Sequence, residues 1–215
     1  MKYAKISIKT IKKILKCFCT ELTATQTAEL LNLNRHTIDR YYQIFREKTL
    51  EYQVKHLSKL SGDIEIDESY FGSKHKSDKR GRSIEKKIPV VGILKRNGKV
   101  YARIIPDASR KSLLPIIEEL VAKSRSNIYT DQWRSYDGLV FSGYKHYRIN
   151  HSKEFAKNNH HINGIESFWS YVKRKMRKHN GIKQDKFLQY LKEAEFRFNH
   201  RNEDIHNLLV KIIFN

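Results

Sequence analysis

The chain of 215 residues has only two cysteines, three prolines and nine glycines. Two cysteines cannot build a disulfide scaffold, and Cys17 and Cys19 have no second pair with which to form a zinc site. So little proline and glycine excludes a collagen-like or Pro/Gly-rich chain. No apolar run approaches the ~20 residues of a membrane span, and the N-terminus lacks the apolar core of a signal peptide. We therefore expect a cytoplasmic protein with reduced thiols, no zinc and no membrane partner.

Acidic residues are also scarce. The 23 Asp and Glu residues face 43 Lys and Arg residues, which gives a formal net charge of +20. The basic excess is spread over the chain, which fits an extended nucleic-acid-binding surface better than a single amphipathic membrane helix. The apolar fraction of 39% and the aromatic fraction of 11% suffice for a packed core, which argues against full disorder. The composition therefore predicts a folded protein that binds nucleic acid.

The first 60 residues are typical of a helix-turn-helix. Thr23 followed by Gln26 is the signature of a capping box that begins one helix, and Asn34 is a good N-cap for the next helix after a three-residue turn. A generic helical hairpin has the same pattern, but the basic charge favours DNA binding. The second helix would begin with the residues that normally read base edges. The candidate DNA contacts on it are Arg35, His36, Thr37 and Arg40.

The chain becomes β-rich after residue 61. The pattern predicts strands at 64–71, 89–94 and 100–106, a helix at 109–121, strands at 127–130 and 144–149 around a short helix or turn, and closing helices at roughly 161–179 and 184–200. Three strands followed by alternating helix and strand is the ribonuclease H-like order. We therefore predict an α/β protein with a helix-turn-helix domain over residues 1–60. A ribonuclease H-like mixed-sheet catalytic domain, with the C-terminal helices, would cover residues 61–215.

Two aspartates lie at the expected sheet. Asp67 falls inside the first strand, and Asp131 directly follows the fourth. A charge inside a buried strand costs several kcal/mol unless it is paired or metal-bound. If these strands are neighbours, ~4.8 Å apart, the two carboxylates can share one hard cation. Each aspartate taken alone can also be a turn cap or an exposed edge charge.

Glu166 is the third acid, on the helix expected after residue 161. Lys173 follows seven residues later, close to two turns, so both side chains project from one face ~10 Å apart. Asn163 and Arg177 share this polar stripe, and a solvated Glu–Lys face is the alternative explanation of the pair. A separate apolar stripe would pack on the sheet and leave Glu166 at its margin. Its members are Ile165, Phe168, Trp169, Val172 and Met176.

Three carboxylates suit Mg²⁺ or Mn²⁺, which prefer oxygen ligands. Two such ions ~3.5–4 Å apart activate an attacking oxygen and stabilise the leaving oxygen of a phosphodiester. In a basic chain with a helix-turn-helix, Asp67, Asp131 and Glu166 therefore predict metal-dependent cleavage or strand transfer on DNA.

At these residues the chain resembles the short bacterial insertion-sequence DDE transposases with an ISXO2-like catalytic domain. The likeness covers roughly residues 60–200 and keeps the order of the motifs. The interval of 35 residues between Asp131 and Glu166 is found in many DDE recombinases. The matching motifs are Asp67-Glu68-Ser69-Tyr70-Phe71-Gly72, Lys79-Arg80-Gly81-Arg82, Tyr129-Thr130-Asp131, Asn150-His151-Ser152, and His161-Ile162-Asn163-Gly164-Ile165-Glu166-Ser167-Phe168-Trp169 with Lys173.

The resemblance implies that Asp67, Asp131 and Glu166 hold the divalent ions and that Lys173 contacts DNA near the scissile phosphate. Some relatives use an asparagine at the third acidic position, but we prefer Glu166 to Asn163 because a carboxylate is the stronger metal ligand. Many relatives carry an N-terminal zinc ribbon, which two cysteines cannot form, so recognition of the element ends falls to the helix-turn-helix. The further candidate DNA contacts are Lys79, Arg80, Arg82, His151, Asn163 and Arg177.

We therefore expect a transposase that binds the terminal inverted repeats of its element, cleaves the DNA at the ends and joins them to target DNA. Because two ends must be paired, we expect a homo-dimer or higher oligomer on DNA, associated with the bacterial nucleoid. One alternative is a non-catalytic helix-turn-helix regulator derived from a transposase, against which the three carboxylates argue. Another is a ribonuclease H-like nuclease acting on RNA–DNA hybrids, against which the N-terminal DNA reader argues.

Overall fold

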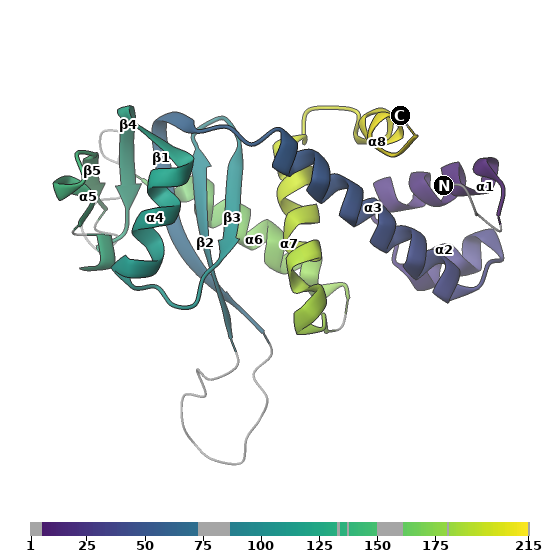
Figure 1. Ribbon diagram of the computed structural model, residues 1–215. Helices are drawn as coiled ribbons and strands as arrows, with labels where there is room; N and C mark the ends of the chain where they lie inside the picture. Colours follow the sequence, from purple (N-terminus) through teal and green to yellow (C-terminus); the bar gives the residue numbers. More distant parts are fainter. Residues whose placement is uncertain are drawn as a thin grey trace, which may run out of the picture. The chain divides into compact units, whose positions relative to one another are not determined.

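The computed structural model describes residues 6–72, 87–132, 134–136, 138–149, 161–179 and 181–214 (Figure 1). The chain divides into two compact units, a helical unit of residues 1–57 and 176–215 and a sheet unit of residues 58–175. Among the described residues, no helix is both long and apolar enough to cross a membrane. The elements are α1 (Ile8–Cys19), α2 (Ala24–Leu31), α3 (Arg35–Lys55), β1 (Leu60–Phe71), β2 (Ile88–Lys95), β3 (Val100–Ile104), α4 (Arg110–Leu120), β4 (Val121–Thr130), η1 (Arg134–Tyr136), α5 (Gly138–Phe141), β5 (Lys145–Arg148), α6 (Asn163–Arg177), α7 (Gln184–Asn199) and α8 (Ile205–Phe214).

The sheet unit contains a five-stranded mixed sheet in the order β3-β2-β1-β4-β5. β1 pairs antiparallel with β2, and β2 pairs antiparallel with β3, whereas β4 runs parallel to both β1 and β5. The expected α/β class and the expected order of strands are thus confirmed. β1 begins at Leu60 and β4 at Val121, earlier than predicted, because these two residues already pair across a register shift at Gly62.

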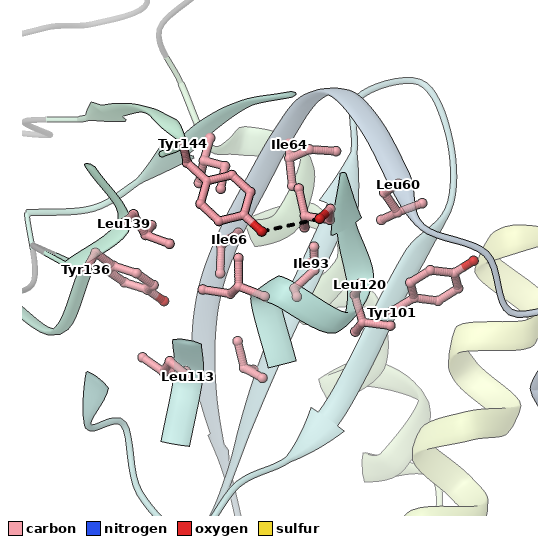
Figure 2. Close-up of a cluster of buried hydrophobic side chains, with 14 of the residues drawn as sticks. Leu60, Ile64, Ile66, Ile93, Tyr101, Leu113, Leu120, Tyr136, Leu139 and Tyr144 are labelled. Carbon is pink, nitrogen blue, oxygen red and sulfur yellow. Dashed lines mark hydrogen bonds between the residues drawn. The ribbon is translucent and has the colours of Figure 1, made fainter. Parts of the chain in front are cut away.

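One face of this sheet carries the main apolar core of the unit. Side chains alternate between the two faces of a strand, and Ile64 and Ile66 of β1 point to the face that is covered by Leu113 and Ile117 of α4. Figure 2 shows this cluster, which extends to Tyr136, Leu139 and Tyr144 beyond β4. The Tyr144 hydroxyl donates a hydrogen bond to the Val121 carbonyl at 3.3 Å (Figure 2). The burial of this layer fixes which residues of β1 face the other way.

The other face of the sheet is covered by α6. The expected apolar stripe is confirmed for Ile165, Phe168, Trp169 and Val172, which are buried, whereas its fifth residue, Met176, is only partly buried. Helix and sheet approach closely at Gly92 of β2, where an added Cβ would lie 2.5 Å from Cζ2 of Trp169. Only glycine leaves room for the indole at this point, so α6 lies directly against the strands.

The helical unit begins as the sequence predicts. The capping box of Thr23 and Gln26 is formed, and α2 ends at Asn32, which adopts a left-handed conformation with φ of 50°. The Asn34 side chain accepts a hydrogen bond from the His36 backbone N–H and begins α3. The buried Ile38 turns one side of α3 into the core of the unit. Two helices joined by a three-residue turn are therefore present.

The C-terminal helices pack differently from the expected grouping with the second domain. Phe196 of α7 and Leu209 of α8 lie in one apolar cluster with Ile11 of α1 and Phe45 of α3. The sequence analysis did not predict α8. The reason for this packing is that α1 and α3 expose apolar faces that the short α2 cannot cover alone, and an apolar face must be buried against another element.

Buried charges join α7 to α1 and α3. Glu193 of α7 accepts a hydrogen bond from Nε of Arg46 at 2.7 Å and from Nε of Arg197 at 2.8 Å. Arg197 also donates to the carbonyl oxygens of Phe18 and Cys19 at the end of α1. Glu193, Arg46 and Arg197 are all buried. A single carboxylate therefore neutralises two guanidinium groups inside this unit.

We predict that Glu193→Ala lowers the free energy of unfolding by about 3–5 kcal/mol, because it leaves two guanidinium groups buried without their counter-charge. Denaturant unfolding followed by circular dichroism measures the change. The control is Glu203→Ala, which removes a partly exposed pair with His200 and should cost at most ~1 kcal/mol. Equal losses for the two variants would contradict this account of the buried network.

Candidate active site

Parallel pairing of β1 and β4 brings the two predicted aspartates together. Asp63 pairs with Asn127 and Glu65 with Tyr129. Continuing this register by two residues places Asp131, just after β4, beside Asp67 on β1. The expectation that the first and fourth strands are neighbours is therefore confirmed. Asp67 also pairs with Gly92, so its side chain faces α6 rather than the core under α4.

The charge environment of Asp67 includes the two other predicted acids. Its pKa is raised from 3.8 to about 6, chiefly by burial and further by the negative charges of Asp131 and Glu166. The Glu68 backbone N–H partly opposes this shift. Asp131 and Glu166 therefore each lie near enough to Asp67 to repel its carboxylate, and a positive charge beside Asp67 would be stabilised.

A fourth acid, Glu68, lies on the opposite face of β1. Burial raises its pKa to about 7, and the charges of Asp67 and Asp131 add to the shift, while the phenol of Tyr136 opposes it. Burial also raises the pKa of Tyr136 well above its usual value. The sequence analysis assigned no role to Glu68. The feature of the sequence that could have drawn attention to Glu68 is that two acids, Asp67 and Glu68, follow one another inside one predicted strand.

Several polar side chains of α6 lie on the exposed side of this helix. Asn163, Glu166 and Lys173 are exposed at the surface of the sheet unit. The Lys173 ammonium lies 5.9 Å from the centre of the Phe71 ring at the end of β1. Arg177, the last residue of α6, belongs to the helical unit. The structure thus brings Glu166 and Lys173 to the end of the strand that carries Asp67.

The described part of the chain contains no group of three or more His, Cys, Asp or Glu side chains arranged to hold a metal ion. Carboxylate oxygens are nevertheless the donors that Mg²⁺ and Mn²⁺ prefer. The repulsion of the Asp67 carboxylate by Asp131 and Glu166 is the kind of interaction that a bound cation relieves. The type of donor therefore fits a hard divalent ion, and the side chains would have to close around it.

The predicted DNA contacts on α3 lie in its first two turns. Arg35, His36 and Arg40 are exposed and Thr37 is partly buried. Nε of Arg35 lies 3.6 Å from a carboxylate oxygen of Asp39, and both side chains are at least half exposed. The remaining predicted contacts Lys79, Arg80, Arg82 and His151 lie outside the described residues.

A cavity of about 570 Å³ lies beside the start of α3 within the helical unit. Arg35, Arg46 and Lys178 contribute positive charge to its lining, and Glu29 and Asp39 contribute negative charge. The lining is therefore of mixed charge, unlike the carboxylate group of the sheet unit.

Residues 59–199 match the ISXO2-like transposase domain, so the chain belongs to this transposase family. Over 102 residues it is 51% identical to an uncharacterized transposase-like protein of Haemophilus influenzae, covering 47% of this chain and 82% of that protein. The Mos1 strand transfer complex aligns with 15% identity and a TM-score of 0.32, over 100% of this chain and 80% of that chain. The Mos1 mariner paired end complex with Mn aligns with 14% identity and a TM-score of 0.34, over 100% and 81%. The family expected from the sequence motifs is confirmed.

The raised pKa of Asp67 predicts how the stability of the metal-free protein depends on pH. The folded protein holds this proton more tightly than the unfolded chain does, so stability falls as the pH rises from about 4 to about 6. Asp67→Asn removes the buried charge. In EDTA, we therefore expect the variant to melt at a higher temperature than the wild type at pH 8, and at nearly the same temperature at pH 4.

Glu119→Gln is the control, because the Glu119 side chain is 58% exposed and its oxygen lies 3.9 Å from Arg103. Its melting temperature should follow that of the wild type at both values of pH. Scanning calorimetry measures all three proteins. A lower melting temperature for Asp67→Asn than for the wild type at pH 8 would show that the ionised Asp67 carboxylate does not cost stability.

Proposed function

We propose that this chain is the transposase of an insertion sequence and that its sheet unit is a ribonuclease H-like catalytic domain. It binds the terminal inverted repeats of its element, hydrolyses the DNA at the element ends, and transfers the freed 3′-hydroxyl to target DNA. The observation that carries this proposal is that Asp131 and Glu166 lie close enough to Asp67 to raise its pKa. The three acids come from two parallel strands and from the helix packed on them. Membership of the ISXO2-like transposase family supports it.

Asp67, Asp131 and Glu166 would hold Mg²⁺ or Mn²⁺, in a site for two ions. When bound, such ions activate the attacking oxygen and stabilise the leaving oxygen of a phosphodiester. The contribution of the protein is a half-buried aspartate on the central strand, which pairs with Gly92 of β2 two residues after the last pair of β1 with β4. Carboxylates from β1, from the residue after β4 and from α6 would then present oxygen atoms to one region.

Lys173 positions the DNA beside these carboxylates. Its long cation lies on the exposed side of α6, two turns after Glu166, where it can bind the scissile phosphate and hold it in place. A cation there also offsets the negative charge that develops on the phosphate during the reaction. Asn163 and Arg177 extend the polar side of this helix, and the basic residues Lys79, Arg80, Arg82 and His151 add further DNA contacts.

Recognition of the element ends is the role of the helical unit. α2, the turn and α3 act as a helix-turn-helix whose second helix enters the major groove. Arg35, His36 and Thr37 at the start of α3 then face base edges, while Arg40 contacts the backbone of the DNA. Because each element has two ends, two copies of the chain act together on DNA.

The first test of this function is DNA nicking by three amide variants. The substrate is a duplex copied from the DNA that flanks the gene. The wild type should nick it with Mg²⁺ or Mn²⁺ and fail to do so with EDTA. Asp67→Asn, Asp131→Asn and Glu166→Gln should each reduce nicking by ~100-fold or more, because each removes one charged metal ligand, while binding of the duplex stays close to that of the wild type.

Glu119→Gln is again a matched control, since it makes the same chemical change on the exposed part of α4, and it should nick like the wild type. Wild-type nicking by any of the three amide variants would remove that residue from the active site.

The second test concerns end recognition. If Arg35 reads a base edge, Arg35→Ala should weaken binding to the element end by about 1–3 kcal/mol and leave binding to an unrelated duplex almost unchanged. Lys48→Ala is the control on the same helix, because Lys48 lies more than three turns after Arg35 and pairs with Glu51. Fluorescence anisotropy at a fixed salt concentration measures both. An equal loss of affinity for both duplexes would instead assign Arg35 to nonspecific phosphate binding.

A further inference from the structure

Another acid on β1, Glu65, lies two residues before Asp67 and shares its face of the sheet. Its side chain is only 1% exposed. A carboxylate buried to this extent is costly unless it is paired and hydrogen-bonded. None of the catalytic steps proposed above uses Glu65, so its partners show what it contributes.

Glu65 joins three elements of the sheet unit. Its Oε1 atom accepts a hydrogen bond from Nε of Arg96, just after β2, at 2.8 Å. Its Oε2 atom accepts a hydrogen bond from the backbone N–H of Ile165, in the first turn of α6, at 2.9 Å. Arg96 in turn donates to the carbonyl oxygen of His161, just before α6, and its guanidinium lies 4.0 Å from the centre of the Tyr129 ring. The carboxylate thus links β1, the end of β2 and the beginning of α6.

The hydrogen bond to Ile165 satisfies a backbone donor that no residue within α6 can satisfy, because the first four N–H groups of a helix have no partner inside it. A negative charge at this end also interacts favourably with the helix dipole. The interaction is therefore suited to fix the start of α6 at a defined place above β1.

Gly164 allows this close approach. A Cβ at this position would lie 2.8 Å from Oε2 of Glu65 and 3.0 Å from Cδ2 of Leu94. Any other residue would push the first turn of α6 away from the sheet or displace the Glu65 carboxylate. Glycine and the buried carboxylate together set the distance between β1 and the helix.

We propose that Glu65 is a positioning residue that places Glu166 for metal binding. Glu166 directly follows Ile165, so the bond from Glu65 to the Ile165 amide holds the backbone next to Glu166. Because Glu65 and Asp67 are on the same strand, this bond fixes the third carboxylate relative to the first. The inference rests on the proposed function, since it gives Glu65 its role through the metal site.

The test measures binding of Mn²⁺ alone by isothermal titration calorimetry, together with the Mg²⁺ concentration that gives half-maximal nicking. Glu65→Gln should fold, weaken Mn²⁺ binding by about 10–100-fold, which is the usual range for residues that orient metal ligands, and raise the Mg²⁺ requirement by a similar factor. Gly164→Ala, which keeps every charge but adds a methyl group against Glu65, should shift both measurements in the same direction.

Glu193→Gln is the matched control, because it neutralises another buried, ion-paired glutamate in the helical unit. It should lower the melting temperature without changing Mn²⁺ affinity. If Glu65→Gln and Gly164→Ala bind Mn²⁺ like the wild type, Glu65 serves stability alone and the inference fails. If the wild type itself binds no Mn²⁺ and nicks without a metal ion, the proposed function fails, and the two failures are thereby distinguished.

Discussion

Parallel pairing of β1 with β4 brings together two residues that are far apart in the sequence. Glu65 and Tyr129 are partners across the two strands. Two residues further along each strand, this register brings Asp67 and Asp131 side by side. The pairing of β1 with β2 on its other side holds Asp67 at the centre of five strands. The backbone of Asp67 cannot move without breaking the ladder between β1 and β2, and the rest of the candidate site depends on that constraint.

The free-energy cost of burying carboxylates in this sheet falls mainly on β1. β1 carries Glu65, Asp67 and Glu68, and each of them is at least partly buried. Glu65 is compensated within the protein by Arg96 and by the start of α6. The environment of Asp67 instead disfavours its charged form, because burial and two neighbouring acids raise its pKa. Strongly perturbed carboxylates of this kind are typical of functional sites, and this contrast within one strand fits the two roles proposed, positioning for Glu65 and metal binding for Asp67.

Much of the fold and of the candidate site could be predicted from the sequence. The apolar stripe of α6 and the strand around Asp67 have clear periodicity, and the Thr23 capping box is a local signal. The packing of α7 and α8 on the helical unit could not be predicted, because periodicity shows that a helix has an apolar face but not which element covers it. Glu65 was overlooked for a similar reason, since its partners Arg96 and Ile165 are 31 and 100 residues away in the sequence.

The central claim is that β1, the end of β4 and the start of α6 together form the site for the divalent ions. Cleavage of the polypeptide by Fe²⁺ with ascorbate and peroxide tests this directly, because a bound iron ion cuts the backbone only close to its own site. Mass spectrometry of the fragments should place the cuts around residues 67, 131 and 166, with none in residues 1–57, and excess Mg²⁺ should suppress them. Cuts in only one of the three segments, or mainly in the helical unit, would contradict the account.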